Sequence, residues 1–416
     1  MKMLARNLVL KLLTRFAKRR LNPQTKIIGI TGSVGKTTAK EAAAKILASK
    51  FPVLASQKSF NSEFGVPLTL LGEDSGYSNP LKWLGILIRA ELKSFSKLKA
   101  EKIILELGVD KPGDMRRLLQ VIQPQTGVFL NVQPVHLESE QFAGLTEIAQ
   151  EKGQLITNLP EDAYAILNVD DELVAKTETR ARKITFGVNA TADLRAINVS
   201  ENIRGIGAEL RFHETSVSLK VPILGRQNIY ALLAAIAVGI SNGIALKNCV
   251  AILADFHLPP GRLNLLNGIR GSKLIDGSYN ANPASTVSAL ETLQRLETSG
   301  KKIALLGQMN ELGADSEKYH REIGSRAAAI ADEVIGVFGN AKLISSEARR
   351  LGKPAQFFET AASAAEYLQR KLSINDFVLI KGSQNKVRLE RAVTRLLANP
   401  TDRKLLCRQE AFWQKH

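Results

Sequence analysis

Short apolar runs alternate with helix-like segments along most of the chain. The runs of the first half have the composition of buried strands and lie at 26–30, 102–107, 127–132 and 163–169. Residues 39–50 are rich in Ala, Lys and Leu, a composition that favours helix, and further helical segments lie between the runs. This alternation predicts an α/β fold with a mostly parallel sheet, in which ligands gather at the carboxyl ends of the strands.

Residues 194–224 follow a different pattern. Strand-like runs at 194–197, 209–213 and 217–221 surround Gly205 and Gly207, which predicts an antiparallel β appendage. The segment Leu258-Pro259-Pro260-Gly261-Arg262 then marks a boundary. Beyond it, strand-like runs alternate again with helix-like segments. The strand-like runs are 303–306, 333–338 and 377–380, and the helix-like segments are 285–298, 316–331, 341–351, 361–371 and 386–397.

The pattern divides the chain into three expected parts. We expect a basic N-terminal helix over 1–24, a central α/β domain over 25–259, and a C-terminal Rossmann-like α/β domain over 260–416. A length of 416 residues agrees with two or three domains. Hydrophobic residues make up 44% and charged residues 23%, so disorder, collagen-like structure and coiled coil are disfavoured.

Charge and cysteine content narrow the choice of partner and compartment. The net charge of +17 favours an acidic partner, such as nucleotide phosphates, nucleic acid or an anionic membrane surface. Cys249 and Cys407 are the two cysteines of the sequence, so a disulfide scaffold or a cysteine zinc site is excluded. This composition fits a reducing cytoplasm.

Two basic helices stand out. Residues 1–21 carry seven basic side chains, and Leu4, Leu8, Leu12 and Phe16 recur at a spacing that a helix places on one stripe. A second basic amphipathic helix is expected in an apparent insertion at 74–98, where Asn79-Pro80 marks its start. Its apolar face is made of Leu81, Leu84, Ile88, Leu92 and Phe95, and its basic residues Lys82, Arg89 and Lys93 lie opposite.

The role of these helices is left open by the sequence. No stretch of 18 apolar residues occurs, so no transmembrane helix is expected. Lys11 and Arg15 interrupt the N-terminal apolar run, and no small-residue cleavage site follows, which disfavours a signal peptide. The helices either dock on the protein and carry solvated charge, or bind an anionic membrane surface. Nucleic acid is not expected as a partner, because no zinc knuckle, RNA-recognition motif or clear helix-turn-helix accompanies the charge.

A glycine-rich loop follows the first strand-like run. The segment Thr31-Gly32-Ser33-Val34-Gly35-Lys36-Thr37-Thr38 lies between this strand and the helix-like residues 39–50, which is the context of a phosphate-binding loop. Lys36 is expected to reach the β- and γ-phosphates, and Thr37 to hold Mg²⁺. The spacing departs from the strict P-loop pattern, because Ile30 stands where that pattern has glycine. This departure indicates a particular subclass.

Three further polar residues follow in an order that suits a nucleotide site. Glu106 follows the run 103–105, His136 follows 131–135, and Lys152 lies in the segment 148–153. A carboxylate and an imidazole near a phosphate-binding loop are reasonable ligands for Mg²⁺. Taken alone, each residue is more simply a solvated or capping side chain, but their order after the loop favours a metal site.

The ordered set of motifs over residues 26–395 resembles the Mur ligases, the ATP-dependent amide ligases of peptidoglycan synthesis. Besides the loop, which shares the family's glycine spacing, the motifs of the central region are 61–67 (NSEFGVP), 106–108 (ELG), 110–114 (DKPGD), 131–138 (NVQPVHLE), 151–153 (EKG) and 224–228 (LGRQN). Those of the C-terminal region are 260–262 (PGR), 276–283 (DGSYNANP), 306–313 (LGQMNELG) and 381–383 (KGS). The motifs at 278–283 and 381–383 are similar to the branch that adds D-alanyl-D-alanine.

The resemblance implies a role for individual residues. Gly32, Ser33, Val34, Gly35, Lys36, Thr37 and Thr38 would bind ATP phosphates, while Asn228, Arg262 and Asp276 would contact the nucleotide from elsewhere. Thr37, Glu106, His136 and Lys152 would form the Mg²⁺ site, with Lys152 carbamylated by CO₂ and so made anionic. Lys36, His136, Lys152, Lys381 and Ser383 would serve catalysis, and Asn61, Ser62, Tyr279 and Asn280 would contact substrate.

The implied reaction is amide formation through an acyl phosphate, in which ATP activates a carboxylate and an amine then displaces phosphate. The expected substrates are a peptidoglycan precursor and D-alanyl-D-alanine or a similar amine. The expected enzyme is a cytoplasmic monomer, with peripheral contact at the inner face of the membrane through its basic helices. Through cell-wall synthesis it would serve cell shape and division.

Two departures from the family affect substrate recognition. The family's N-terminal UDP-binding domain has no counterpart before the loop, so the enzyme either holds the UDP substrate differently or uses a different acceptor, for example a lipid-linked one. Gln384 stands where arginine is common, and Lys386 or Arg388 is the candidate replacement for binding a dipeptide carboxylate. A nucleic-acid-binding ATPase and a catalytically silent relative are the remaining alternatives, and the joint retention of Lys36, Glu106 and Lys152 argues against the latter.

Overall fold

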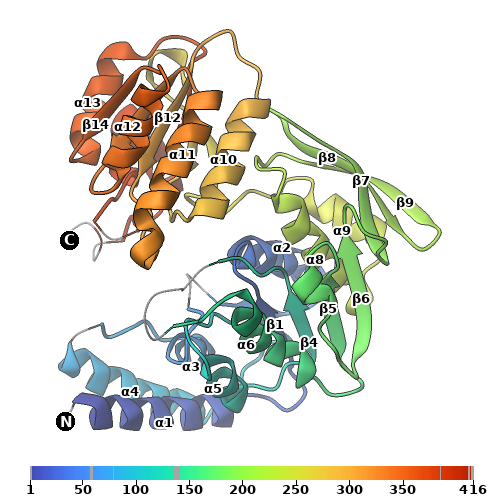
Figure 1. Cartoon of the computed structure of the whole chain (residues 1–416). Coiled ribbons are helices and arrows are strands. Elements are labelled where there is room, and N and C mark those ends of the chain that lie inside the picture. Colours follow the sequence, from blue (N-terminus) through green and yellow to red (C-terminus); the bar gives the residue numbers. More distant parts are fainter. Residues whose placement is uncertain are drawn as a thin grey trace.

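Two α/β domains, each built on its own sheet, form the molecule (Figure 1). The structure is a computed structural model that describes residues 2–56, 60–77, 79–134, 141–384, 386–410 and 413. In the first domain nine strands have the order β2-β3-β1-β4-β5-β6-β7-β8-β9. They are β1 Lys26–Thr31, β2 Val53–Ala55, β3 Lys102–Glu106, β4 Thr126–Phe129, β5 Tyr164–Asn168, β6 Arg182–Gly187, β7 Leu194–Asn202, β8 Gly205–Phe212 and β9 Thr215–Val221.

Helices cover both faces of this sheet. They are α1 Lys2–Arg20, α2 Lys36–Ala48, α3 Gly65–Leu71, α4 Pro80–Ser94, α5 Asp114–Val121, α6 Leu145–Thr157, α7 Glu172–Ala175, α8 Asn228–Ser241 and α9 Leu246–Leu253. The alternation of side chains along β1 explains the layering. Ile28 and Ile30 are buried with α2 and α8, whereas Ile27 is buried on the opposite face with α3, α5 and α6. A strand that is apolar on both faces is typical of a central parallel strand.

The segment 194–224 extends this sheet. Strands β7, β8 and β9 pair antiparallel, which confirms the antiparallel pattern predicted for these residues. Strand β7 also pairs parallel with β6 through Phe186↔Leu194 and Gly187↔Arg195. The three strands therefore continue the central sheet and are not a separate appendage.

The second domain repeats the α/β principle with a sheet of order β10-β11-β15-β12-β13-β14. Its strands are β10 Asn264–Asn267, β11 Lys273–Gly277, β12 Lys302–Gly307, β13 Glu333–Val337, β14 Ala355–Phe358 and β15 Phe377–Lys381. Its helices are α10 Pro283–Arg295, α11 Ser316–Ile330, α12 Ala341–Arg350, α13 Ala361–Lys371 and α14 Glu390–Leu396, with short 3₁₀ turns η1 Ile269–Gly271, η2 Gly313–Asp315 and η3 Pro400–Leu405. Apart from the antiparallel pair β10–β11, the strands run parallel.

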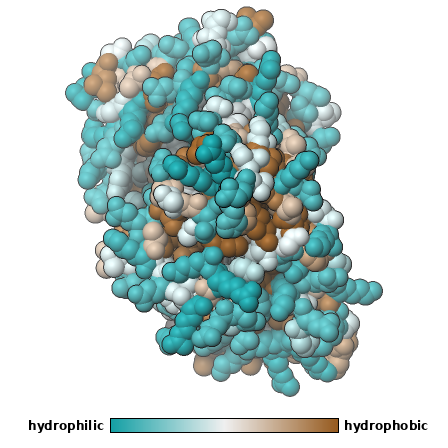
Figure 2. Space-filling model, turned by 90° about the vertical axis from the view of Figure 1, so that its right-hand side faces the viewer, coloured by the Kyte–Doolittle hydropathy of each residue, from teal (hydrophilic) through white to brown (hydrophobic). Residues whose placement is uncertain are grey.

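The two domains share apolar contact where the chain passes between them. Leu258 and Leu263, from the connecting segment, belong to a buried cluster that also contains Leu253 of α9 and Ile275 of β11. Figure 2 shows hydrophobic side chains gathered at mid-height of one face, at the level of this junction, with polar side chains above and below. The junction is therefore packed on one side of the molecule.

Both basic helices predicted from the sequence form in the structure. In α1 the buried residues are Leu13, Phe16 and Ala17, while Leu4 and Leu8 of the predicted stripe are 76% and 59% exposed. The stripe from Leu4 to Phe16 is therefore buried only toward its C-terminal end, and its N-terminal half is exposed. Helix α4 begins at Pro80, with the Asn79 side chain accepting from the N–H groups of Leu81 and Lys82, as Asn79-Pro80 predicts.

Candidate active site

The loop after β1 has the geometry of a phosphate-binding loop. Gly32 and Gly35 have φ values of 150° and 86°, a region that favours glycine. A Cβ at Gly32 would lie 2.9 Å from the Cβ of Leu130, so the loop approaches the next strand too closely for a side chain there. Helix α2 begins directly afterwards at Lys36. Its first N–H groups and the positive end of its dipole therefore face the cavity, where they favour an anion.

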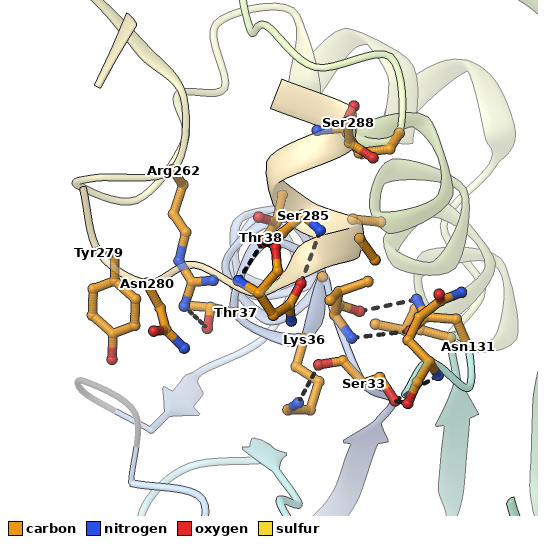
Figure 3. A pocket seen from close by; sticks show the side chains of 18 of the residues that line it. Ser33, Lys36, Thr37, Thr38, Asn131, Arg262, Tyr279, Asn280, Ser285 and Ser288 are labelled. Atoms are coloured by element: carbon orange, nitrogen blue, oxygen red, sulfur yellow. Dashed lines mark hydrogen bonds between the residues drawn. The ribbon is translucent and has the colours of Figure 1, made fainter. Parts of the chain in front are cut away.

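A neighbouring segment holds this loop in place (Figure 3). The side chain of Asn131, just beyond β4, accepts a hydrogen bond from the N–H of Val34 at 2.9 Å and donates to the Val34 carbonyl at 3.0 Å. The N–H of Ser33 donates to the Asn131 carbonyl, and the Ser33 hydroxyl accepts from the N–H of Gln133. Sequence reasoning gave Asn131 no role, although it lies in a quoted motif at a strand end.

Lys36 lies inside the loop that precedes it. Its ammonium donates to the carbonyls of Gly32 at 2.6 Å and Ser33 at 3.3 Å. Burial lowers the pKa of Lys36, and the nearby Arg262 guanidinium lowers it further, while Glu106 and Asp110 oppose this shift. An anionic ligand would offset the unfavourable clustering of Lys36 and Arg262, because it would lie between two cations.

Thr37 and Glu106 come together at the ends of α2 and β3. The Thr37 hydroxyl donates to Glu106 Oε2 at 3.3 Å. Glu106 is 1% exposed, and its Oε1 accepts no hydrogen bond within the described residues, with Lys40 Nζ at 3.5 Å. A hydroxyl and a buried carboxylate with an unsatisfied oxygen are suitable donors for a hard cation. The predicted partnership of Thr37 and Glu106 thus has a geometric basis.

The other two predicted members of the metal site are Lys152, which the structure describes, and His136, which it does not. Lys152, on α6, lines the cavity and is 1% exposed. Burial lowers the pKa of Lys152 to about 7, and the charge of Lys36 contributes to this shift. His136 lies outside the described residues. Across the ranges that the structure does describe, no group of three or more His, Cys, Asp and Glu side chains is placed to hold a metal.

Arg262 connects the two domains across the cavity. It is the last residue of the boundary segment and precedes β10, and its guanidinium donates to the Thr37 hydroxyl at 3.2 Å. The same guanidinium lies over the Tyr279 ring, 4.2 Å from the ring centre. Figure 3 shows Arg262, Tyr279 and Asn280 on one side of the pocket, facing the loop residues. Tyr279 and Asn280 both line the cavity, and their contact with substrate stays a prediction.

A buried polar network supports this second wall from behind. The ammonium of Lys381, at the end of β15, donates to the Asn280 carbonyl at 2.9 Å, and the Ser383 hydroxyl donates to the Ala281 carbonyl at 2.9 Å. Burial lowers the pKa of Lys381 to about 7, with Arg262 adding to the effect. Lys381 lines the cavity, but Ser383 is fully buried and does not. Ser383 therefore positions the wall and does not reach the cavity.

Asp276 also lies behind the wall. It is fully buried on β11, accepts from the N–H of Ser278 at 3.0 Å, and its pKa is raised by burial. The predicted contact between Asp276 and the nucleotide has no counterpart on the cavity surface. Arg408, from the C-terminal tail, donates to the carbonyls of Ser278 and Tyr279 and to Glu390 Oε2. No sequence pattern indicates this role of Arg408, because it lies 130 residues beyond Ser278.

The cavity between the domains has a volume of about 730 Å³. Of the predicted site residues, those that line it are Ser33, Val34, Gly35, Lys36, Thr37, Thr38, Asn61, Glu106, Lys152, Asn228, Arg262, Tyr279, Asn280 and Lys381. Gly32, Ser62, Asp276 and Ser383 do not line it. The Ser62 hydroxyl accepts instead from the N–H of Gly65 at the start of α3.

Sequence reasoning missed several lining residues. The start of α10 faces the cavity through Ser285 and Ser288, and Asn282 caps that helix. The signal was present, because Asn282-Pro283 is a helix-start pattern. Asp170, near the Asn228 end of the cavity, accepts from the Tyr230 hydroxyl at 2.9 Å. No motif pointed to that pair.

Neither Lys386 nor Arg388, the candidate replacements for the arginine that is common at position 384, lines the cavity. Gln384 lines the cavity. Arg388 is 6% exposed, and its guanidinium is bound to Glu390 Oε1 at 2.6 Å and to the Trp413 carbonyl at 2.8 Å. Lys386 is exposed and lies outside the lining. Arg388 is therefore a structural cation of the second domain.

Fold and site together define a two-domain nucleotide-binding protein of the P-loop type, with phosphate-binding residues on one domain and a second cationic wall on the other. The family models for the Mur ligase middle domain and the Mur ligase glutamate ligase domain match residues 30–239 and 261–384. The chain belongs to the Mur ligase family. It is therefore an ATP-dependent, ADP-forming ligase.

The similar proteins are consistent with one branch of the family. The chain is 31% identical to the UDP-N-acetylmuramoyl-tripeptide–D-alanyl-D-alanine ligase of Escherichia coli, over 90% of this chain and 78% of that protein. It is 28% identical to the Bacillus subtilis ligase of the same name, over 90% and 77%. The crystal structure of the MurF ligase of Thermotoga maritima with ADP superposes with a TM-score of 0.77 at 26% identity, covering 93% of this chain and 83% of that one.

Proposed function

We propose that this enzyme joins D-alanyl-D-alanine to UDP-N-acetylmuramoyl-tripeptide, the reaction named for its relatives in E. coli and B. subtilis. The observation that carries the proposal is the Arg262–Thr37 hydrogen bond of 3.2 Å across the cavity. It brings the phosphate-binding loop of one domain within reach of a cation from the other. Residues 25–259 serve as the ATP-binding unit, and residues 260–416 complete the site.

The chemistry follows from the charges at this junction. A carboxylate reacts poorly with an amine, because its oxygen is a poor leaving group. ATP converts it to an acyl phosphate, which the amine then attacks to give an amide and phosphate. Lys36 and Arg262 stabilise negative charge on the transferring phosphoryl group from two sides. Lys381, with its lowered pKa, is placed beside Asn280 to exchange a proton with the incoming amine.

Thr37 and Glu106 are the described residues that would hold Mg²⁺. Their oxygens lie 3.3 Å apart, and Glu106 Oε1 is buried without a hydrogen bond. When bound, the ion neutralises phosphate charge. His136 is proposed as a further ligand from the sequence alone.

Lys152 is the proposed site of carbamylation. It is buried in the cavity wall, and its pKa is lowered to about 7 by burial and by the charge of Lys36, which favours the neutral amine that reacts with CO₂. Carbamylation would convert a buried cation beside Lys36 into an anion, and so remove an unfavourable pair of like charges. This argument supports the assignment on the charges of this chain.

The proposed cellular setting follows from the substrate. We propose a monomer that works in the cytoplasm, in contact with the inner face of the membrane through the basic helices α1 and α4. Among the described helices, none has both the length and the hydrophobicity needed to cross a bilayer.

The first test measures phosphate release and product mass. The purified chain would be given ATP, Mg²⁺, D-alanyl-D-alanine and UDP-N-acetylmuramoyl-tripeptide. The expected product is the UDP-pentapeptide, formed with one phosphate per turnover. Binding of ATP without this product would contradict the proposed acceptor, and lipid-linked precursors would then be assayed under the same conditions.

The carbamate has a separate test. Lys152→Ala should lose roughly 10³-fold in ligation rate, the order expected for removing one group that holds transition-state charge, and a short carboxylate should partly restore the rate. Lys176→Ala, which removes an exposed lysine paired with Glu172, is the matched control and should leave the rate unchanged. Full activity of Lys152→Ala would exclude the assignment.

A further inference from the structure

Helix α4 presents an apolar ridge to solvent. The ridge consists of Leu81, Leu84, Ile88, Leu92 and Phe95, which are 79%, 58%, 54%, 67% and 63% exposed. At 100° per residue these five side chains fall on one narrow stripe of the helix. The sequence identifies this stripe but leaves open whether it docks on the protein or binds a membrane surface, and the structure shows that the stripe is exposed. Large apolar patches of this kind mark interaction surfaces.

The opposite side of α4 already has its partner within the chain. Ile86 and Ala90 are buried in the cluster that contains Leu13 and Ala17 of α1. Arg89 and Lys93 bind Glu73, with nitrogen–oxygen distances of 2.8 and 2.6 Å. The helix is therefore fixed by its inner face and by two ion pairs. The outer ridge does not need to be buried for the helix to form.

Helix α1 lies beside α4 and adds charge to the same surface. The two helices pack against each other, and they end at the same place, because the Arg19 guanidinium lies 3.7 Å from the centre of the Phe95 ring. On the exposed side of α1, Leu4 and Leu8 are followed by Lys11, Arg15 and Lys18. Helix α1 contains no acidic residue, and α4 contains one, Glu91.

The pair lies at one end of the molecule. Figure 1 shows α1 and α4 side by side at the bottom of the first domain, on the side away from the second domain. A flat surface that meets this end would leave the second domain free in solution. It would also leave the junction between the domains uncovered.

We propose that the ridge of α4 and the exposed side of α1 form one docking surface for an anionic lipid bilayer. The leucines, Ile88 and Phe95 enter the boundary between headgroups and acyl chains, and the basic half of α1 contacts anionic headgroups. Apolar insertion combined with basic charge is the pattern of helices that lie in a membrane interface. This inference deepens the membrane contact proposed above and rests on it, but it does not depend on the identity of the substrate.

The experiment measures sedimentation of the full chain with vesicles. Vesicles of phosphatidylcholine and phosphatidylglycerol at about 3:1 supply anionic charge on the order of that of bacterial inner leaflets, and pure phosphatidylcholine is the neutral probe. We expect binding to the anionic vesicles, weaker binding to the neutral ones, and a loss of binding at high salt. Absence of binding to anionic vesicles would overturn the proposal.

Two pairs of variants locate the surface. Leu84→Asp/Ile88→Asp should weaken binding to anionic vesicles by roughly tenfold or more, because two inserted side chains are lost. Ile374→Asp, which changes a 70% exposed residue of the second domain, should leave binding unchanged. Arg15→Glu/Lys18→Glu should abolish the preference for anionic vesicles, whereas Lys183→Glu/Lys220→Glu, on exposed positions of β6 and β9, should preserve it.

Other occupants of the ridge give different results. If a second copy of the chain covers the ridge, the protein will be a dimer by light scattering and Leu84→Asp/Ile88→Asp will make it monomeric, which would overturn the proposal. Ligation is assayed in parallel without vesicles, and none of these variants should change it. If the unchanged chain binds anionic vesicles but does not catalyse ligation, that result will count against the proposed function and not against the docking surface.

Discussion

The two walls of the cavity are built in different ways. The first wall is one continuous segment, residues 31–38, whose shape comes from two glycines and the start of α2. The second wall, at Tyr279 and Asn280, is held by residues far away in the chain. Lys381 lies 101 residues beyond Asn280, and Arg408 lies 130 residues beyond Ser278.

Because the two walls are built differently, substitutions in them should affect the reaction rate and the folding stability to different degrees. The Lys36 side chain adds little to packing in the first wall, because the loop is held mainly by its own backbone and by Asn131. Removal of a supporting residue behind the second wall leaves buried polar groups without partners. Substitutions in the first wall should therefore impair the reaction alone, and those behind the second wall should impair folding as well.

The largest effect is expected for Lys36→Ala. Loss of the ammonium from the loop should lower kcat by about 10³-fold, because its charge acts on the transferring phosphoryl group. The thermal midpoint should not fall, since burial already disfavours the charge of Lys36. Steady-state kinetics and calorimetry on the same preparation would check both. The control is Lys45→Ala, on the same helix, which removes a surface pair with Asp255. A fall in the thermal midpoint of Lys36→Ala would contradict the expectation that this substitution impairs the reaction but not folding.

Arg408→Ala should mainly lower the folding stability, in contrast to Lys36→Ala, which should mainly lower the catalytic rate. Its guanidinium pairs with Glu390 Oε2 at 3.0 Å, and both side chains are buried. Breaking a buried pair by removing one partner costs about 3–5 kcal/mol of unfolding free energy. Denaturant unfolding would measure this loss. Where enough folded protein remains, the KM for substrate should rise, because Tyr279 and Ser278 lose their support.

A neighbour in the same tail provides the control for Arg408. Arg403 is exposed, and its guanidinium binds Gln409 Oε1 at 2.7 Å. Arg403→Ala should change the unfolding free energy by less than about 0.5 kcal/mol. Equal losses for Arg403→Ala and Arg408→Ala would show that the tail, and not the buried pair, supports the wall.

The smallest effect concerns pH. The pKa of Lys381 is about 7 in the folded protein and 10.5 in the reference state. Between these values the unfolded chain binds a proton that the folded protein has lost, so this lysine makes stability rise as pH increases. Below pH 7 both states are protonated and the contribution is constant. Lys381→Met should therefore show a smaller rise in thermal midpoint from pH 7 to pH 9 than the unchanged protein.

The same test of pH-dependent stability applies to Lys152, which lies on the side of the first domain. Its pKa is also about 7, so in CO₂-free buffer Lys152→Met should reduce the pH dependence in the same direction. In bicarbonate, a carbamylated Lys152 no longer titrates as an amine, and the difference from Lys152→Met should shrink. A difference that bicarbonate leaves unchanged would count against carbamylation.

The sequence predicts the first wall better than the second, for a physical reason. The loop residues and Lys36 follow from local spacing, and the apolar runs of β1 and β3 are correctly predicted because both faces of these strands are buried. The strands β2, β6, β10 and β14 were missed because each is only partly buried and so has a weaker apolar pattern, and β11 was missed as well. Asp276 and Ser383 belong to quoted motifs, but only the tertiary structure shows that they lie behind the cavity surface.

The apolar stripe of α4 is identified by the sequence, but its orientation is left open. Periodicity identifies an apolar stripe, but it does not say whether that stripe faces the protein or something outside it. The inner face of α4 is made by Ile86 and Ala90, which are less conspicuous in the sequence than the five ridge residues. Only the packing against α1 shows which face is inside.

The strand order of the second sheet has a consequence for synthesis. Strand β15 lies between β11 and β12, so the strand of this sheet that is synthesised after the other five fills its centre. The register pairs Leu274 with Val378 and Ala304 with Leu379. A nascent chain that ends before residue 377 therefore lacks the strand that joins β11 to β12, and the facing edges of these two strands have no partner in it. Because domains fold in order as they emerge, the nucleotide loop is formed well before its covering wall, and the late segment decides when the ligase becomes complete.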